Sequence, residues 1–258
     1  MKKWLLFLVA ATMLLASCHR DEPTPTPTPE VRLTQQYVSI VGSEGDTLTT
    51  ATEDYLWENG LLRNIHGFLT INSTGSTIPS DNTFIYNNDG NCIEEHYTSP
   101  NLNYDMYYTY EGGRMTRAIE MMGSDTIYRV TITGYTTDGH IQALTVEYLT
   151  SGKVKEYQIT WENGDMTAYT EHPITPAGED VSYIIEYDNY PNVNTGMPVA
   201  DAVFDPQMIA TRASVHNWQI LDQEYFYNNG RLVKATSSSS SLNTVTYYTY
   251  SDGTTGRE

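Results

Sequence analysis

The chain has 258 residues and a formal net charge of −18, because 32 Asp and Glu outnumber 14 Lys and Arg. Nucleic acid and anionic lipid surfaces repel so acidic a chain, which excludes them as expected partners. The sequence contains 21 tyrosines but only 5 phenylalanines. This favours a packed face that still meets water, because each tyrosine hydroxyl needs a hydrogen-bond partner.

The first 17 residues have the pattern of a secretory signal. Two lysines precede an apolar run from Trp4 to Leu15, which is shorter than the about 20 residues that a membrane-spanning helix needs. The run ends in Leu-Ala-Ser-Cys, which matches the lipobox of bacterial lipoproteins, in which cleavage before the cysteine leaves its sulfur to carry lipid. We therefore predict a signal peptide over residues 1–17 and lipidation, palmitate included, at Cys18. The alternative is an ordinary signal peptide that happens to contain a cysteine.

Residues 18–30 are expected to link the lipidated cysteine to the folded part of the chain. His-Arg-Asp-Glu follows Cys18, and a Pro-Thr tract then runs through Pro29, as is typical of an extended, semi-rigid spacer. Acidic residues directly behind a lipidated cysteine resemble the export signal of surface-exposed Bacteroides-group lipoproteins. We therefore expect a protein held to the outer membrane by its N-terminal lipid. Its surface-exposed face is favoured over the periplasmic one.

Residues 31–258 are dominated by a repeated phrase, which we call a hairpin copy. An aromatic residue is followed by polar residues, by a turn pair that ends in Gly, and then by an apolar residue. Asn-Gly and Asp-Gly pairs are strong hairpin signals, because type I′ turns need positive φ at both central residues. In chain order the copies are Trp57–Leu62, Tyr86–Cys92, Tyr110–Met115, Tyr135–Ile141, Trp161–Met166 and Tyr227–Leu232, with a partial copy at Tyr250–Gly253 and an apparent eighth, without its Gly, at Ile185–Pro191.

The hairpin copies predict the architecture of residues 31–258. The first and last residues of each complete copy should face each other, and alternation places Phe84 with Tyr86 and Ile159 with Trp161 on one apolar face. This spacing predicts an all-β, antiparallel up-and-down meander of about 14–16 strands. Such a sheet must curl, yet a round barrel of about 16 strands is too wide for side chains to fill. We therefore expect a flattened or partly filled barrel, or a strongly curved sheet.

Residues 191–222, which we call the excursion, do not follow the repeat of the hairpin copies. Residues 207–213 are predicted to form a short helix after Pro206. The segment is expected to plug or cap the open end of a barrel, and the alternative is a ligand-binding wall, since long loops often carry function. Trp218 is the candidate ligand contact, because no repeat position accounts for it. A second break, the serine-rich segment over residues 236–241, is expected to be a strand connection or a mobile tip.

The sequence holds no recognisable catalytic, metal or cofactor motif. HExxH, GxSxG, P-loop and GxGxxG patterns are absent, so we predict no catalytic residue, no metal and no cofactor. Glu94 and His96 share a strand face, but a third ligand is not evident, so a surface pair is expected. Two Asp-Thr-aliphatic triplets resemble the O-glycosylation signal of exported Bacteroides-group proteins, which makes Thr47 and Thr126 candidate sites.

The hairpin copies resemble the YD repeat of RHS-type proteins, Y-x-Y-D-x-x-G-R-L, with Glu or Asn mostly in place of Asp. With the lipobox, the chain is similar to a family of uncharacterised Bacteroides-group lipoproteins that are described as having a porin-like barrel. The resemblance covers roughly residues 31 to 256 and implies a fold and a location, but no activity.

We predict a non-catalytic envelope lipoprotein, favoured at the cell surface, that binds a glycan or a peptide. One alternative is a structural or accessory subunit of an outer-membrane complex. The other is a glycoside hydrolase with an unrecognised carboxylate pair, since 32 acids give many accidental pairs.

Overall fold

The computed structural model describes residues 31–219, 223–238 and 242–256, and the chain from Arg32 onward forms one compact unit. The predicted signal peptide, Cys18 and its linker lie outside the described residues, as does the end of the serine-rich segment at Ser241.

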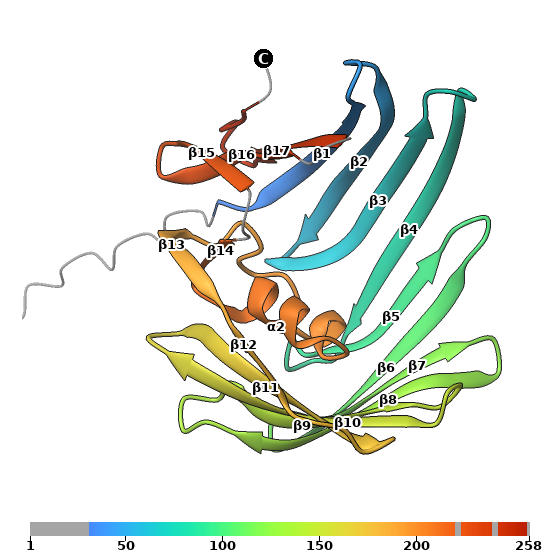
Figure 1. The fold of residues 1–258 in the computed structure, drawn as a ribbon, viewed down its shortest axis with the longest axis vertical. Helices are drawn as coiled ribbons and strands as arrows, with labels where there is room; N and C mark the ends of the chain where they lie inside the picture. The colour runs from blue at the N-terminus through green and yellow to red at the C-terminus, as the bar shows by residue number, and fades with distance from the viewer. Residues whose placement is uncertain (1–30, 220–222, 239–241, 257–258) are drawn as a thin grey trace, which may run out of the picture. The chain divides into compact units, whose positions relative to one another are not determined.

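Fifteen strands form one antiparallel sheet, in which neighbours along the chain are also neighbours in space (Figure 1). The chain order is interrupted once, where β17 pairs with β1. The prediction of an up-and-down meander is confirmed. The strands are β1 (Leu33–Gly42), β2 (Thr47–Glu58), β3 (Leu61–Ile71), β4 (Ser76–Tyr86), β5 (Cys92–Thr98), β6 (Asn103–Glu111), β7 (Arg114–Met122), β8 (Asp125–Tyr135), β9 (Ile141–Tyr148), β10 (Lys153–Glu162), β11 (Asp165–Thr175), β12 (Val181–Ile184), β15 (Gln223–Asn228), β16 (Arg231–Ser238) and β17 (Leu242–Tyr250).

The hairpin copies form the predicted turns and the predicted cross-strand pairs. Asn59, Asn163 and Asn229 have φ between 49° and 53°, the left-handed conformation that a type I′ turn requires. The alternation also holds, since Phe84 is buried while its neighbour Ile85 is 38% exposed. The observed pairs are Trp57 with Leu62, Tyr86 with Cys92, Tyr110 with Met115, Tyr135 with Ile141, Trp161 with Met166 and Tyr227 with Leu232.

A β-bulge accompanies the hairpin copies and was not predicted from the sequence. Trp57 faces Leu62 but Leu56 faces Asn64, so Arg63 has no partner on the opposite strand. The same shift occurs in five other copies. A bulge bends its strand and increases the local twist. Repetition at one end of successive hairpins therefore curls the sheet.

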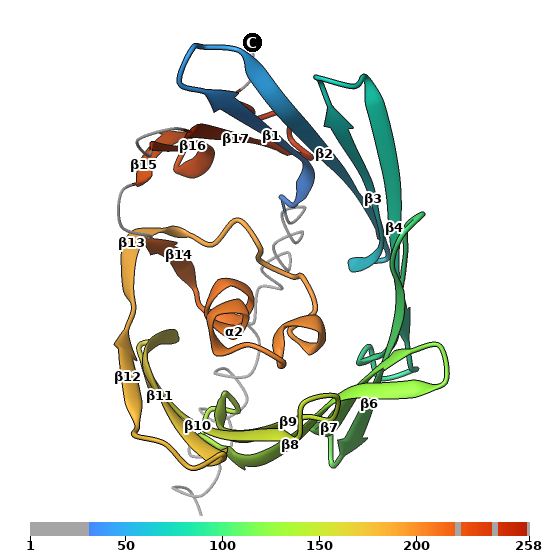
Figure 2. The same cartoon turned by 45° about the vertical axis from the view of Figure 1, so that its right-hand side comes forward.

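The sheet curves strongly but does not close, because its edge strands β12 and β15 do not pair with each other. A separate two-stranded sheet of β13 (Glu186–Pro191) and β14 (His216–Gln219) lies between these edges (Figure 2). The segment between them carries a single 3-10 turn, η1 (Ala200–Ala202), and the helix α2 (Pro206–Ala213). This helix lies inside the curve of the sheet (Figure 2). Of the predicted alternatives, the strongly curved sheet is confirmed, because the sheet does not close into a barrel.

Helix α2 begins where the sequence predicts. Pro206 occupies the first turn, where its missing N–H group costs nothing, and the Asp205 side chain caps the helix by accepting from the Gln207 N–H at 2.9 Å. Ile209 and Ala210 are fully buried. The excursion is thus a folded insert with its own apolar face, and it fills part of the interior.

The prediction of an eighth hairpin at Ile185–Pro191 is wrong. β13 does not turn back on itself but pairs with β14, about 30 residues later, with Tyr187 opposite Trp218. The segment lacks the glycine that takes the left-handed conformation at the turn of the other copies at no steric cost.

Candidate functional site

A ladder of aromatic hydrogen bonds joins successive hairpins along one end of the sheet. In most copies the aromatic residue donates its N–H or O–H group to the carbonyl of the apolar residue that ends the copy before it. Trp57, which opens the first copy, donates to Leu33 of β1 instead. Tyr187 keeps this bond although its segment is no hairpin. The bonds are Trp57 to Leu33 (2.7 Å), Tyr86 to Leu62 (2.8 Å), Tyr135 to Met115 (2.6 Å), Trp161 to Ile141 (2.8 Å), Tyr187 to Met166 (2.9 Å) and Tyr250 to Leu232 (2.8 Å).

A basic side chain covers the face of most of these aromatic rings. The guanidinium carbon lies 4.5 to 5.7 Å from the ring centroid in four cation–π pairs, and the His140 ring stacks on Trp161 with centroids 4.4 Å apart. Arg114, His140 and Arg231 belong to the copy before the aromatic residue that they cover. Arg63 directly follows such a copy, and Arg32 directly precedes β1. The four pairs are Arg32 with Trp57, Arg63 with Tyr86, Arg114 with Tyr135 and Arg231 with Tyr250.

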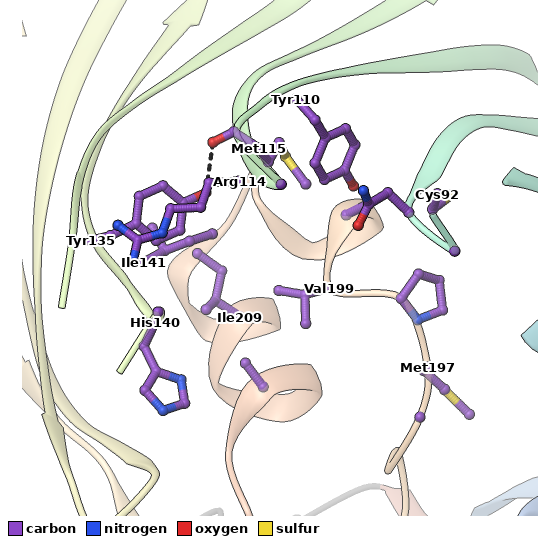
Figure 3. A pocket seen from close by; sticks show the side chains of 18 of the residues that line it. Cys92, Tyr110, Arg114, Met115, Tyr135, His140, Ile141, Met197, Val199 and Ile209 are labelled. Carbon is purple, nitrogen blue, oxygen red and sulfur yellow. Dashed lines mark hydrogen bonds between the residues drawn. The ribbon is translucent and has the colours of Figure 1, made fainter. Parts of the chain in front are cut away.

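A cavity of about 390 Å³, called the large cavity below, lies between this row of turns and the excursion. Its wall on the sheet side carries the aromatic residues of four consecutive copies, Tyr86, Tyr110, Tyr135 and Trp161. Figure 3 shows Tyr110, Tyr135 and Arg114 on the sheet side and Val199 and Ile209 on the excursion side. Aromatic walls with a few polar groups are typical of small-ligand sites, which start at about 300 Å³.

Tyr110 departs from the ladder. Among the repeat aromatics, it is the one whose hydroxyl has no hydrogen-bond partner among the described residues. Asn91 stands at the position that Arg114, His140 and Arg231 occupy in their copies. Burial raises the pKa of the Tyr110 phenol well above its usual value, so the group stays protonated and can donate. Burial also raises the pKa of Tyr135, although Arg114 acts in the opposite direction.

Polar contacts fix the excursion wall of the cavity against the sheet. The His216 N–H and imidazole both contact the carboxylate of Asp165, at 3.0 and 2.7 Å, beside the turn of the Trp161 copy. The Met166 N–H donates to Ser214 Oγ at 3.1 Å, and the Asn192 amide donates to the Ser214 carbonyl at 2.9 Å. These contacts are made by buried or half-buried groups and hold the wall in one arrangement.

A buried aspartate on β13 anchors the excursion at the next residue, Asn217. Asp188 accepts hydrogen bonds from the backbone N–H and the side-chain amide of Asn217, at 3.3 and 3.1 Å, and from the Tyr227 hydroxyl. Burial and this carboxylate both raise the pKa of Tyr227. The β13–β14 sheet is thereby joined to β15, across the gap between the edges of the large sheet.

The predicted ligand contact, Trp218, does not line the large cavity. It lies on β14 beside a smaller cavity of about 120 Å³, where its carbonyl accepts from the Tyr225 hydroxyl at 3.2 Å. Its role stays a prediction. Thr47 is exposed and Thr126 is half-buried, and their glycosylation also stays a prediction, as does lipidation of Cys18.

The acidic residues considered for chemistry lie away from the large cavity. Glu94 and His96 form the expected surface pair at 3.3 Å, and His96 also contacts Asp105 at 2.6 Å. The hydrogen bond to Asp105 raises the pKa of His96. Glu95 is fully buried and accepts from Asn82 at 2.7 Å and from a tyrosine hydroxyl at 2.8 Å.

Two further searches cover the part of the chain that the structure describes. No group of three or more His, Cys, Asp or Glu side chains there is arranged to hold a metal ion. No helix there is both long enough and apolar enough to cross a membrane.

Comparison with known proteins yields a likeness of fold. No family model and no curated protein matches the chain. Among solved structures, the chain is similar to a porin-like protein from Bacteroides uniformis ATCC 8492, with a TM-score of 0.53 and 14% sequence identity. The match covers 84% of this chain and 97% of that one. At this identity the likeness supports the porin-like β architecture, whereas the lipoprotein family and the YD repeat stay predictions.

Proposed function

We propose that the chain is a non-catalytic lipoprotein of the bacterial outer membrane that binds a glycan in the cavity between its hairpin turns and the excursion. The observation that carries the proposal is the cavity wall, where consecutive hairpins place Tyr86, Tyr110, Tyr135 and Trp161 side by side. Aromatic and hydroxyl groups suit sugars, because a sugar ring presents both C–H and O–H groups. The lipobox at Cys18 and the fold of the porin-like protein support an envelope location.

The rigidity of the excursion wall favours a ligand-binding role for the excursion over a role as a plug of the interior. A plug needs only to fill space, whereas a binding site needs fixed positions for its contacts, since ordering mobile groups costs affinity. Here Asp165 and Asp188 hold the end of the excursion at His216 and Asn217. The Asn192 amide ties its start to the Ser214 carbonyl. The wall is thus preorganised around a volume that it leaves open.

The test is a glycan array followed by calorimetry on the mature lipoprotein, purified in detergent from the envelope. We expect saturable binding of a glycan that weakens when Tyr110→Ala shortens the wall of the large cavity. Trp218→Ala provides the comparison, because it alters the smaller cavity instead. Loss of binding with Trp218→Ala alone would move the site to the smaller cavity. If no glycan on the array binds, glycan binding is rejected.

The anchor is tested separately by mass spectrometry and membrane fractionation. We expect the mature chain to begin at a triacylated or diacylated Cys18 and to sediment with the outer membrane, and Cys18→Ala to abolish the acyl mass. An unmodified residue 18 in the wild-type protein would refute the location argument and leave the cavity argument intact.

The alternative of an accessory subunit has one observation in its favour. Edge strand β12 is exposed along its whole length, and Ile184 at its end is 85% exposed. Apolar sheet edges invite pairing with another chain. Cross-linking from a photoreactive residue at Ser182 in intact cells would identify such a partner, and a specific protein adduct without any glycan binding would favour this alternative.

A further inference from the structure

The charge of the large cavity is opposite to that of the chain. Asp and Glu number 32 in the sequence against 14 Lys and Arg, yet no carboxylate is among the residues that line the cavity. The basic residues that line it are Arg114 and His140. A cavity that is lined by an arginine and by no carboxylate attracts anions, even in an acidic protein.

Arg114 has no acidic partner among the described residues, unlike Arg231 and Arg63. Arg231, at the same position of its copy, pairs with Asp252 at 3.1 Å, and Arg63 lies 3.9 Å from Glu58. Glu111 faces Arg114 across the hairpin, yet no ion pair with Arg114 exists among the described residues. An arginine without a carboxylate partner among the described residues thus lines the cavity.

Stacking prepares Arg114 to receive a carboxylate. Its guanidinium carbon lies 5.2 Å from the centroid of the Tyr135 ring, and Tyr135 is itself fixed by its hydrogen bond to the Met115 carbonyl. A guanidinium group that stacks by its face keeps its edge N–H groups available for a bidentate contact. The unused donor of Tyr110 lies on the same wall.

We propose that the cavity binds an acidic sugar residue, whose carboxylate pairs with Arg114 and whose hydroxyls meet the Tyr110 hydroxyl and the Asn91 amide. This rests on the proposed function and names its ligand class. A sugar fits better than a peptide, because peptides commonly add to a strand edge or fill a long groove. The cavity is compact instead, and its sheet-side wall consists of turns and strand ends.

The experiment measures binding of matched sugars by calorimetry to the mature lipoprotein in detergent. The probes are digalacturonate, an alginate disaccharide and sialyllactose, each beside its carboxyl-reduced or desialylated neutral counterpart. We expect at least one acidic probe to bind about tenfold or more tightly than its neutral counterpart, the factor that one charged hydrogen-bonded contact provides. The preference should shrink as salt concentration rises.

Variants assign the preference to one side chain. Arg114→Gln should abolish the acidic preference, and Arg114→Lys should restore part of it, because lysine keeps the charge but not the planar fork. Arg117→Gln is the matched control, since Arg117 is an exposed arginine on the same strand that does not line the cavity. Circular dichroism of each variant confirms the fold.

The outcomes separate this inference from the proposed function. Equal binding of acidic and neutral probes, or a preference that survives Arg114→Gln, overturns the acidic-sugar inference and leaves glycan binding standing. If no probe binds and the glycan array also shows no binding, both glycan binding and the acidic-sugar inference are overturned. Tighter binding of a tripeptide acid than of its amide and of all the sugars would show that the carboxylate comes from a peptide, which also overturns the inference.

Discussion

The aromatic ladder predicts that two chemically identical substitutions in adjacent hairpins have different costs. Tyr135→Phe removes the hydroxyl that donates to the Met115 carbonyl at 2.6 Å. Met115 is 7% exposed, so its carbonyl has little access to water. Leaving a buried acceptor unpaired costs about 1 to 3 kcal/mol. Tyr110→Phe removes a hydroxyl with no protein partner and should change the free energy of unfolding by less than about 0.5 kcal/mol.

Equilibrium unfolding in urea measures the difference. Both variants keep the ring, so the surface exposed on unfolding, and therefore the slope of the transition, should stay constant while the midpoint falls for Tyr135→Phe alone. In a thermal scan this corresponds to a shift of about 2 to 4 °C for each kcal/mol in a domain of this size. Equal costs for the two variants, or a larger cost for Tyr110→Phe, would contradict the ladder.

Three further predictions use the same unfolding measurement. Gly113→Ala should cost about 1 to 2 kcal/mol for its φ of +80°, and Gly164→Ala should cost more, because a Cβ there would lie 3.1 Å from Val215; equal costs would refute the steric argument. Leu144→Ala should cost about 2 to 5 kcal/mol, because the side chain is 1% exposed, and a cost below this range would place it outside a packed core. The pKa of His96 is raised above 6.5, so the stabilisation by protonated His96 is complete below pH 6.5 and is lost as the pH rises through the folded-state pKa. Because the pair is partly exposed, the stability difference between the wild type and His96→Asn should fall by no more than about 1 kcal/mol between pH 6 and 8. A difference that grows with pH would contradict the raised pKa.

The hairpins could be predicted because their determinants are local. Asn59 and Gly60 specify a turn within four residues, and that turn sets Trp57 against Leu62 without reference to the rest of the chain. The strand count and the meander follow from repeating this step. The start of α2 is local in the same way, since Asp205 and Pro206 define it.

The bulges and the ladder could not be obtained from spacing alone. Arg63, which has no partner on the opposite strand, lies one position past the predicted pair of Trp57 and Leu62. A hairpin with this bulge and a hairpin without it have the same pairs at the turn, so the predicted pairs do not reveal the bulge. The ladder did leave a signal in the sequence. Every aromatic residue that opens a copy is Tyr or Trp and none is Phe, which indicates that each position needs a hydrogen-bond donor as well as a ring.

The cavity could not be predicted because it depends on contacts between distant parts of the chain. Its excursion wall is fixed by pairs such as Asp165 with His216, which are 51 residues apart. Nothing local in either residue specifies the other. The gap between β12 and β15, which β13 and β14 occupy, is likewise a property of the whole sheet.

The choice of Trp218 shows how a repeat directs a search for function. Trp218 is a candidate because no copy position accounts for it, whereas Tyr110 and Arg114 stand at regular positions of a copy. The structure adds candidates at those regular positions: a tyrosine without its carbonyl partner and an arginine without an acidic partner among the described residues. In a scaffold made of repeated hairpins, stabilising contacts are the ones that recur. A position that keeps the residue type but loses the recurring contact is therefore free of that structural task, and its donor is available to a ligand.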